Sequence, residues 1–164
     1  MICKLNMKKT VIAQIVEAIP AFQDSTVAVD MAAASILDIN LTNLRCLGIL
    51  LRSGPIAAKD IASSLNLTRG AITSVIDILE NRGLVERLND PNDRRGVLIA
   101  ATPSARQKVA SLWGPIRVEG EQFLNSYSES ELKTIAHFLR TSEQLQERHA
   151  ERIGKLKNLP GSKM

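Results

Sequence analysis

Apolar side chains recur at intervals of three and four residues along most of this chain, which is the spacing of an amphipathic helix. One such stripe opens the chain, and we expect Pro20 to divide it into a helix over about 8–19 and a second helix over about 22–37. A further helix is predicted over about 42–52, with Thr42 as its N-cap. The pattern therefore predicts a mainly α protein.

Two short helices are expected next, separated by a turn at Asn66-Leu67, and Thr68 is a good N-cap for the second of them. The apolar stripe of this second helix consists of Ile72, Val75, Ile76 and Leu79. Its opposite face carries Gly70, Thr73, Ser74 and Asp77, with Arg69 at the border. That face is small and hydrogen-bonding, which favours close approach to a groove over simple solvation. Gly83 is the expected C-terminal stop.

A β-hairpin is predicted directly after this helix. The apolar pair Leu84-Val85 and the run 97–100 read as strands, and the segment Asp90–Gly96 between them reads as a long turn. Two adjacent arginines, Arg94 and Arg95, lie at the far end of that turn. Guanidinium groups bind phosphate and enter narrow minor grooves, so this wing behind a helix-turn-helix is typical of a DNA-reading device.

Two long helices are expected after the hairpin. Thr102-Pro103 is a cap followed by a proline at the first helical position, and Gly114-Pro115 predicts a kink further along. Ser128 and Glu131 form a capping box for the last helix. The segment 158–164 is polar, and we expect a loose tail there.

Composition narrows the class of protein. Aromatic residues make up only 3% of the 164 residues, so an aliphatic core of packed helices is favoured. The net charge is +4, and residues 41–106 hold nine Lys and Arg against six Asp and Glu. This modest basic excess is compatible with nucleic acid. No run is apolar enough for a membrane helix and the N-terminus is unlike a signal peptide, so we expect a cytoplasmic protein without a membrane partner.

The sequence offers no constellation for catalysis. It contains neither a glycine-rich phosphate loop nor a nucleophile elbow, so an enzyme is not expected. His137 and His149 stand on one predicted helix about 18 Å apart, too far to share a metal ion within one subunit. We therefore predict no metal and no cofactor. Cys46 lies in an apolar helix and is expected in the core, whereas Cys3 lies near the N-terminus.

With this order of elements, the segment 68–85, the wing at 90–95 and the following Thr102-Pro103, the chain resembles the MarR family of bacterial transcription regulators over roughly residues 8–155. The resemblance implies a winged helix-turn-helix over 41–102 and a helical dimerisation region built from 1–40 and 103–157. It implies a homodimer that binds pseudo-palindromic double-stranded DNA. Ser74 stands where many members carry arginine, and Gly114-Pro115 interrupts a helix that is often continuous.

Site residues follow from this resemblance position by position. The expected contacts to DNA are Thr68, Arg69, Gly70, Thr73, Ser74, Asp93, Arg94 and Arg95. Arg94 would reach the minor groove, while Asp93 and Arg95 would brace the wing or touch the backbone. The outer helical stripes supply the expected dimerisation residues Ile12, Ile15, Ile19, Leu132, Ile135 and Leu139. A monomer would leave these apolar stripes in water.

Regulation is the least specified part of the prediction. We expect a repressor that is released when a small aromatic or amphipathic molecule binds near Cys46, Trp113 and Pro115, although Trp113 also suits a plain core position. One alternative is a redox-sensing regulator that acts through Cys3 or Cys46. Another is a winged-helix module that binds proteins, which would not need arginines at the wing tip.

Overall fold

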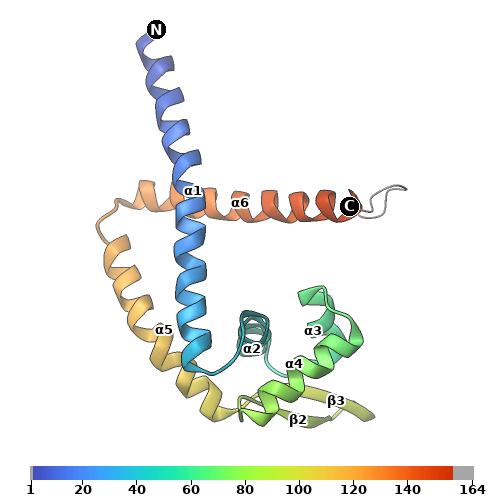
Figure 1. Cartoon of the computed structure of the whole chain (residues 1–164). Helices are drawn as coiled ribbons and strands as arrows, with labels where there is room; N and C mark the ends of the chain where they lie inside the picture. The colour runs from blue at the N-terminus through green and yellow to red at the C-terminus, as the bar shows by residue number, and fades with distance from the viewer. Residues whose placement is uncertain (1, 157–164) are drawn as a thin grey trace. The chain divides into compact units, whose positions relative to one another are not determined.

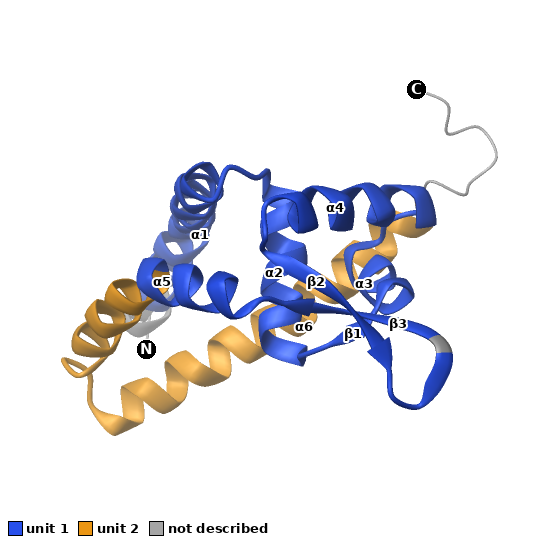
Figure 2. Cartoon of the chain, turned by 90° about the horizontal axis from the view of Figure 1, so that it is seen from below, with its two compact units in different colours: residues 1–112 blue, residues 113–164 orange. Residues whose placement is uncertain are grey.

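The computed structural model describes residues 2–156, and it leaves undescribed the side chains of residues 2–6 and 95. The predicted tail and residue 157 lie outside the described range. Figure 1 labels the elements, which are α1 (Ile2–Ile36), α2 (Leu41–Ser53), β1 (Ile56–Ala57), α3 (Ala58–Leu65), α4 (Arg69–Asn81), β2 (Val85–Asp90), β3 (Asp93–Ala101), α5 (Pro103–Leu124) and α6 (Glu129–Leu156). The chain forms two compact units, residues 1–112 and 113–164, shown in blue and orange in Figure 2.

The prediction that Pro20 divides the first stripe is wrong. Helix α1 is continuous over 35 residues and contains Pro20 in its interior. The fixed φ of proline is itself helical, and a proline removes just one backbone hydrogen bond while it crowds the preceding turn. The helix-forming residues on both sides outweigh that local cost.

The N-cap of helix α2 lies two residues earlier than predicted. Asn40 is the N-cap, and its side-chain Oδ1 accepts a hydrogen bond from the Asn43 amide at 2.9 Å. Thr42 therefore lies inside the first turn and does not cap it. The helix ends as expected at Gly54, whose φ of 76° is a conformation that favours glycine.

The core of the first unit lies among α2, α3, α4 and the sheet. Its largest fully buried side chains are aliphatic, as the scarcity of aromatic residues predicts, and among the described residues only Asn43 and Cys46 join them. The aliphatic ones are Leu47, Leu50, Ile61, Ile72, Leu79 and Leu84. Between α3 and α4, Asn66 adopts a left-handed conformation with φ of 53°, which turns the chain through the predicted helix-turn-helix junction.

The sheet has three antiparallel strands in the order β1-β3-β2. Sequence patterning missed β1, because two residues are too few to show an alternating pattern. The central strand β3 pairs with β1 through Ile56 opposite Ile99, and with β2 from Val85 opposite Ala101. This pairing anchors the base of the wing beside α2 and α3.

Helix α5 runs through Gly114 and Pro115 without ending, so the kink expected there stays a prediction. The capping box before α6 is confirmed, because Ser128 donates from its amide at 2.8 Å and from its hydroxyl at 2.6 Å to Glu131 Oε2. These hydrogen bonds stabilise the carboxylate and lower the pKa of Glu131.

No single described helix is both long and apolar enough to cross a membrane. Residues Met7–Ile36 and α2 pass a test of length and composition together, but the two are bent by 90° against each other, which is weak evidence for a span.

Candidate nucleic-acid interface

Helix α4 is the second helix of the helix-turn-helix, and its N-terminus is fixed as the sequence predicts. Thr68 is its N-cap, with extended backbone angles, and its Oγ1 accepts a hydrogen bond from the Ala71 amide at 3.3 Å. At the other end Gly83 has a φ of 65°, and its amide donates to the Glu80 carbonyl at 2.8 Å. The cap and the stop therefore define a short, regular helix.

The two faces of α4 divide as predicted. Ile72, Val75, Ile76 and Leu79 are buried, whereas Arg69, Gly70, Thr73, Ser74 and Asp77 are exposed. A Cβ added at Gly70 would meet nothing within 4 Å, so packing within the chain does not require glycine there. Because the side chains at Gly70, Thr73 and Ser74 are small, a second molecule can approach the helix backbone on this exposed face.

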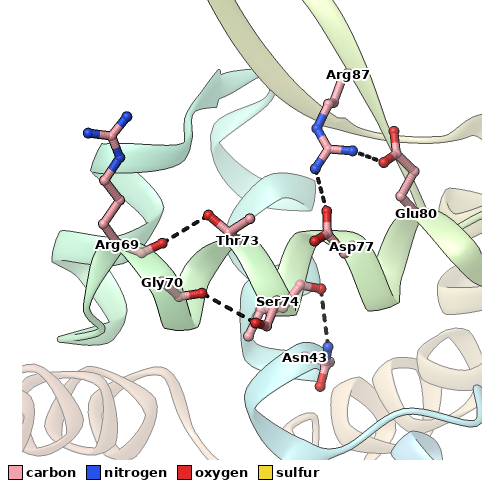
Figure 3. Close-up of polar contacts among 9 residues, drawn as sticks. Asn43, Arg69, Gly70, Thr73, Ser74, Asp77, Glu80 and Arg87 are labelled. Atoms are coloured by element: carbon pink, nitrogen blue, oxygen red, sulfur yellow. Dashed lines mark hydrogen bonds and ion pairs between the residues drawn. The ribbon is translucent and has the colours of Figure 1, made fainter.

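The two hydroxyl groups on this face are bonded to their own helix. Thr73 Oγ1 donates to the Arg69 carbonyl at 2.9 Å, and Ser74 Oγ donates to the Gly70 carbonyl at 3.3 Å (Figure 3). In this arrangement the hydroxyl oxygens turn acceptor lone pairs outward. Hydroxyls of this kind suit either partner type on a base edge, since they rotate at little cost.

The buried side of α4 is held by a residue that sequence reasoning missed. Asn43 on α2 is fully buried, and its Nδ2 donates to the Val75 carbonyl at 3.3 Å (Figure 3). Its Oδ1 has no hydrogen-bond partner among the described residues. A polar residue on the buried stripe of a helix was the available signal, because burial of an amide needs a specific partner.

The wing is a tighter hairpin than the long turn predicted from sequence. Pro91 and Asn92 make the turn, and the Asn92 amide donates to Asp90 Oδ1 at 2.9 Å. Asn89 pairs with Val97 but Asp90 pairs with Asp93, so residues 94–96 have no counterpart on β2 and form a bulge on β3. The correction has a physical cause: the Asp90 side chain closes the turn locally, and the extra residues are absorbed by the bulge.

The bulge presents the predicted arginines. Arg94 is exposed, and Arg95 belongs to β3 but its side chain is outside the description. Gly96 is required in this bulge, because a Cβ there would stand 2.8 Å from the Asp90 Cβ. Asp93, the other predicted wing residue, is exposed beside the turn.

Three side-chain contacts tie the wing to α4 and its C-terminal end. Thr102 Oγ1 donates to the Gly83 carbonyl at 2.8 Å while accepting from the Ala105 amide at 3.1 Å, so the predicted cap of α5 also joins the base of the hairpin to the end of α4. On β2, Arg87 Nη2 lies 2.7 Å from Asp77 Oδ1, and its Nη1 pairs with Glu80 Oε2 (Figure 3). Sequence reasoning missed the Arg87 ion pairs, since they join positions ten and seven residues apart on two elements.

The residues predicted for dimerisation lie on α1 and α6. Ile12, Ile15 and Ile19 are 50%, 45% and 37% exposed, and Leu139 is 54% exposed. Leu132 and Ile135 are half-buried within a single chain.

The residues predicted near an effector belong to different units. Cys46 is completely buried on α2, as expected for a core residue. Trp113 is half-buried and Pro115 is exposed on α5. His137 is exposed and His149 half-buried on α6, and among the described residues no group of three His, Cys, Asp or Glu could hold a metal ion.

Burial raises the pKa of the Cys46 thiol to about 11 from an ordinary value of 9.0. The folded state therefore holds the proton more tightly than the unfolded state. Stability from this group is complete below pH 9 and is lost as the pH rises toward 11. The same burial keeps the reactive thiolate scarce at neutral pH.

We predict that Cys46 resists thiol reagents in the native protein. A Cys3→Ser variant isolates this thiol, and we expect Ellman's reagent to leave it unmodified at pH 7.5 until guanidinium unfolds the chain. Rapid modification of Cys46 in the folded protein would contradict its burial and would support redox sensing through this thiol. Cys3, the other cysteine of the predicted redox alternative, lies outside the residues whose side chains the structure describes.

Comparison with known proteins decides the family. The model of the MarR family matches residues 39–97. An uncharacterised HTH-type transcriptional regulator of Bacillus subtilis, YcgE, is 32% identical over 78% of this chain and 83% of its own length. This chain belongs to the MarR family. The helix-turn-helix and wing are therefore the DNA-binding winged helix of a MarR-family transcriptional regulator. Members of this family are transcriptional regulators and not enzymes.

Two further relatives support this membership. The multiple antibiotic resistance protein MarR of Salmonella typhimurium is 39% identical over 67 residues, which are 41% of this chain and 46% of that protein. The crystal structure of a MarR-like transcriptional regulator from Thermotoga maritima superimposes with a TM-score of 0.63 at 28% identity, covering 79% of this chain and 95% of that one. The predicted fold class, mainly helical with a small β-wing, is confirmed.

Proposed function

We propose that this MarR-family protein is a homodimeric repressor that binds pseudo-palindromic double-stranded DNA. The observation that carries the proposal is the joined pair of α4 and the wing: a helix with an exposed face of small hydrogen-bonding residues, linked to a bulge that presents Arg94. A helix of this kind fits the major groove, and an arginine on a wing fits the adjacent minor groove.

The contacts divide by chemistry. Thr73 and Ser74 face base edges from the middle of the helix, while Thr68 and Arg69 lie at its N-terminus, where backbone amides and a guanidinium bind phosphate. Gly70 allows the backbone to approach closely. The wing residues Asp93 and Arg95 brace Arg94 or touch the DNA backbone.

The dimer follows from the apolar side chains that α1 and α6 leave exposed. Two copies that pair through these helices would place two α4 helices on one face of the duplex, with half-sites about 34–36 Å apart. The region 1–40 with 103–157 then serves dimerisation, and 41–102 serves DNA binding.

Release by a ligand follows from the same geometry. DNA needs both α4 helices at one spacing, so a ligand that prefers another arrangement of the subunits lowers DNA affinity. The half-buried Trp113, two residues before the exposed Pro115 on α5, offers an aromatic side chain to a small aromatic or amphipathic molecule.

The experiment is selection of duplexes from a random pool, followed by titration of the best duplex at several salt concentrations. We expect an inverted repeat with half-sites one helical turn apart and a logarithmic affinity that falls linearly with the logarithm of salt. A flat salt response, or enrichment of no sequence, would favour a protein-interaction module. On the selected duplex, phenolic ligands that release DNA should also change Trp113 fluorescence.

A further inference from the structure

The ion pairs of Arg87 stand at a weakly packed part of the wing. On β2 Val85 is buried, but residues 86–89 are all exposed, so packing against the core does not hold the strand beyond its first residue. Arg87 lies within this exposed stretch and reaches across to two carboxylates of α4 (Figure 3). Its guanidinium therefore fixes the strand where burial does not.

Both partners of Arg87 belong to the helix proposed to enter the major groove. Asp77 lies one turn beyond Thr73 on the same exposed face, and Glu80 follows three residues later. Carboxylates on that face repel DNA phosphates, so their presence is an electrostatic disadvantage for DNA binding unless they serve another purpose.

The two ion pairs of Arg87 form a two-point contact between β2 and α4. A guanidinium presents several N–H groups in a rigid plane, and two of its nitrogens contact two carboxylates on successive parts of one helix. Such a two-point contact restrains the rotation of β2 about its base more than one ion pair does. The base of the hairpin is already held by Thr102 at the Gly83 carbonyl.

We propose that Arg87 is a positioning residue for DNA recognition: by binding Asp77 and Glu80 it holds the wing at the angle at which Arg94 reaches the minor groove while α4 lies in the major groove. The inference rests on the proposed function. Arg87, Asp77 and Glu80 form a clamp that touches no base itself. Because the three side chains are 37–52% exposed, the clamp contributes little to the free energy of folding. Its role is to fix the position of the wing relative to α4.

The test uses variants of the full-length protein on the duplex selected above. Arg87→Met keeps the aliphatic stem and removes both ion pairs. Asp77→Ala with Glu80→Ala removes the same ion pairs while deleting two negative charges from the DNA-facing helix. Loss of the clamp is expected to weaken DNA binding by Arg87→Met about tenfold, whereas in the double variant the loss of two negative charges opposes this effect.

A second measurement reports the position of the wing. In the wild type, Arg94→Ala removes a contact that the clamp holds in place. In the Arg87→Met background the wing is no longer fixed, so we expect Arg94→Ala to cause a smaller fold-change in affinity. Arg117→Met is the matched control, because it removes the same positive charge and one ion pair from α5 and leaves the clamp intact.

Each outcome is decisive. An unchanged Arg94→Ala effect in the Arg87→Met background or in the Asp77/Glu80 double variant would overturn the clamp, because that effect reports the position of the wing and not the charge of α4. Thermal melting confirms that each variant is folded, and the double variant tests the clamp even if Arg87→Met does not fold. If the wild type binds no duplex, or Arg94→Ala has no effect in it, the proposed function fails first and the clamp with it.

Discussion

Replacing Arg94 by alanine is expected to weaken operator binding by about 2 kcal/mol, a ~30-fold rise in Kd, because each of two subunits loses an arginine contact of about 1 kcal/mol or more. The loss should depend on sequence. A guanidinium in the minor groove reads groove width, so discrimination should change at A·T-rich flanks and persist within the half-sites. Fluorescence anisotropy with duplexes that differ only in their flanks measures both effects.

The matched control for this experiment is Arg117→Ala. Arg117 is exposed on α5 and pairs with Glu121 of the same helix, so its removal changes net charge equally without altering the wing. Equal losses from both variants would show a general effect of charge. If Arg94→Ala and Arg95→Ala both preserve operator affinity, the wing does not contact DNA.

Sequence reasoning predicted α4 well because its determinants are local. The Thr68 cap, the buried stripe from Ile72 to Leu79 and the Gly83 stop all act within one or two helical turns. The Ser128 capping box succeeded for the same reason. Interactions over one or two helical turns depend on the spacing of residues along the chain, so they can be predicted from a single sequence.

The errors arose where distant or competing terms decide the structure. Pro20 has a local cost that the long helix around it outweighs, and β1 exists because β3 offers a partner strand. The bulge at 94–96 depends on pairing between two strands, which residue patterns do not specify.

The candidate site shows the same division. The exposed hydroxyls of α4 and the wing arginine were predictable from position on a helix or in a turn. Asn43 and Arg87 were not, because the first acts through the Val75 carbonyl and the second through two carboxylates on another element. Both residues position α4 or the wing and neither is on the predicted DNA-facing surface.

The second large effect is expected at the dimer. Leu139 is 54% exposed in the single chain, and pairing through α6 would bury it in both subunits. Leu139→Asp removes about 2 kcal/mol of apolar burial per subunit and introduces a carboxylate, so the dimer Kd should rise at least ~1000-fold. Light scattering at micromolar concentration should change from dimer to monomer or to aggregate.

Gln144→Asp is the control, since Gln144 is an exposed polar residue of the same helix and the variant adds the same charge. A wild-type protein that is monodisperse and monomeric at micromolar concentration would refute the dimer, and a Leu139→Asp protein that stays dimeric at nanomolar concentration would remove α6 from its interface. If Leu139→Asp is a folded monomer, its operator affinity shows whether dimerisation contributes to DNA binding. A monomer contacts one half-site, so Leu139→Asp should lower operator affinity while preserving the sequence preference of the single half-site, because α4 and the wing of each subunit are unchanged.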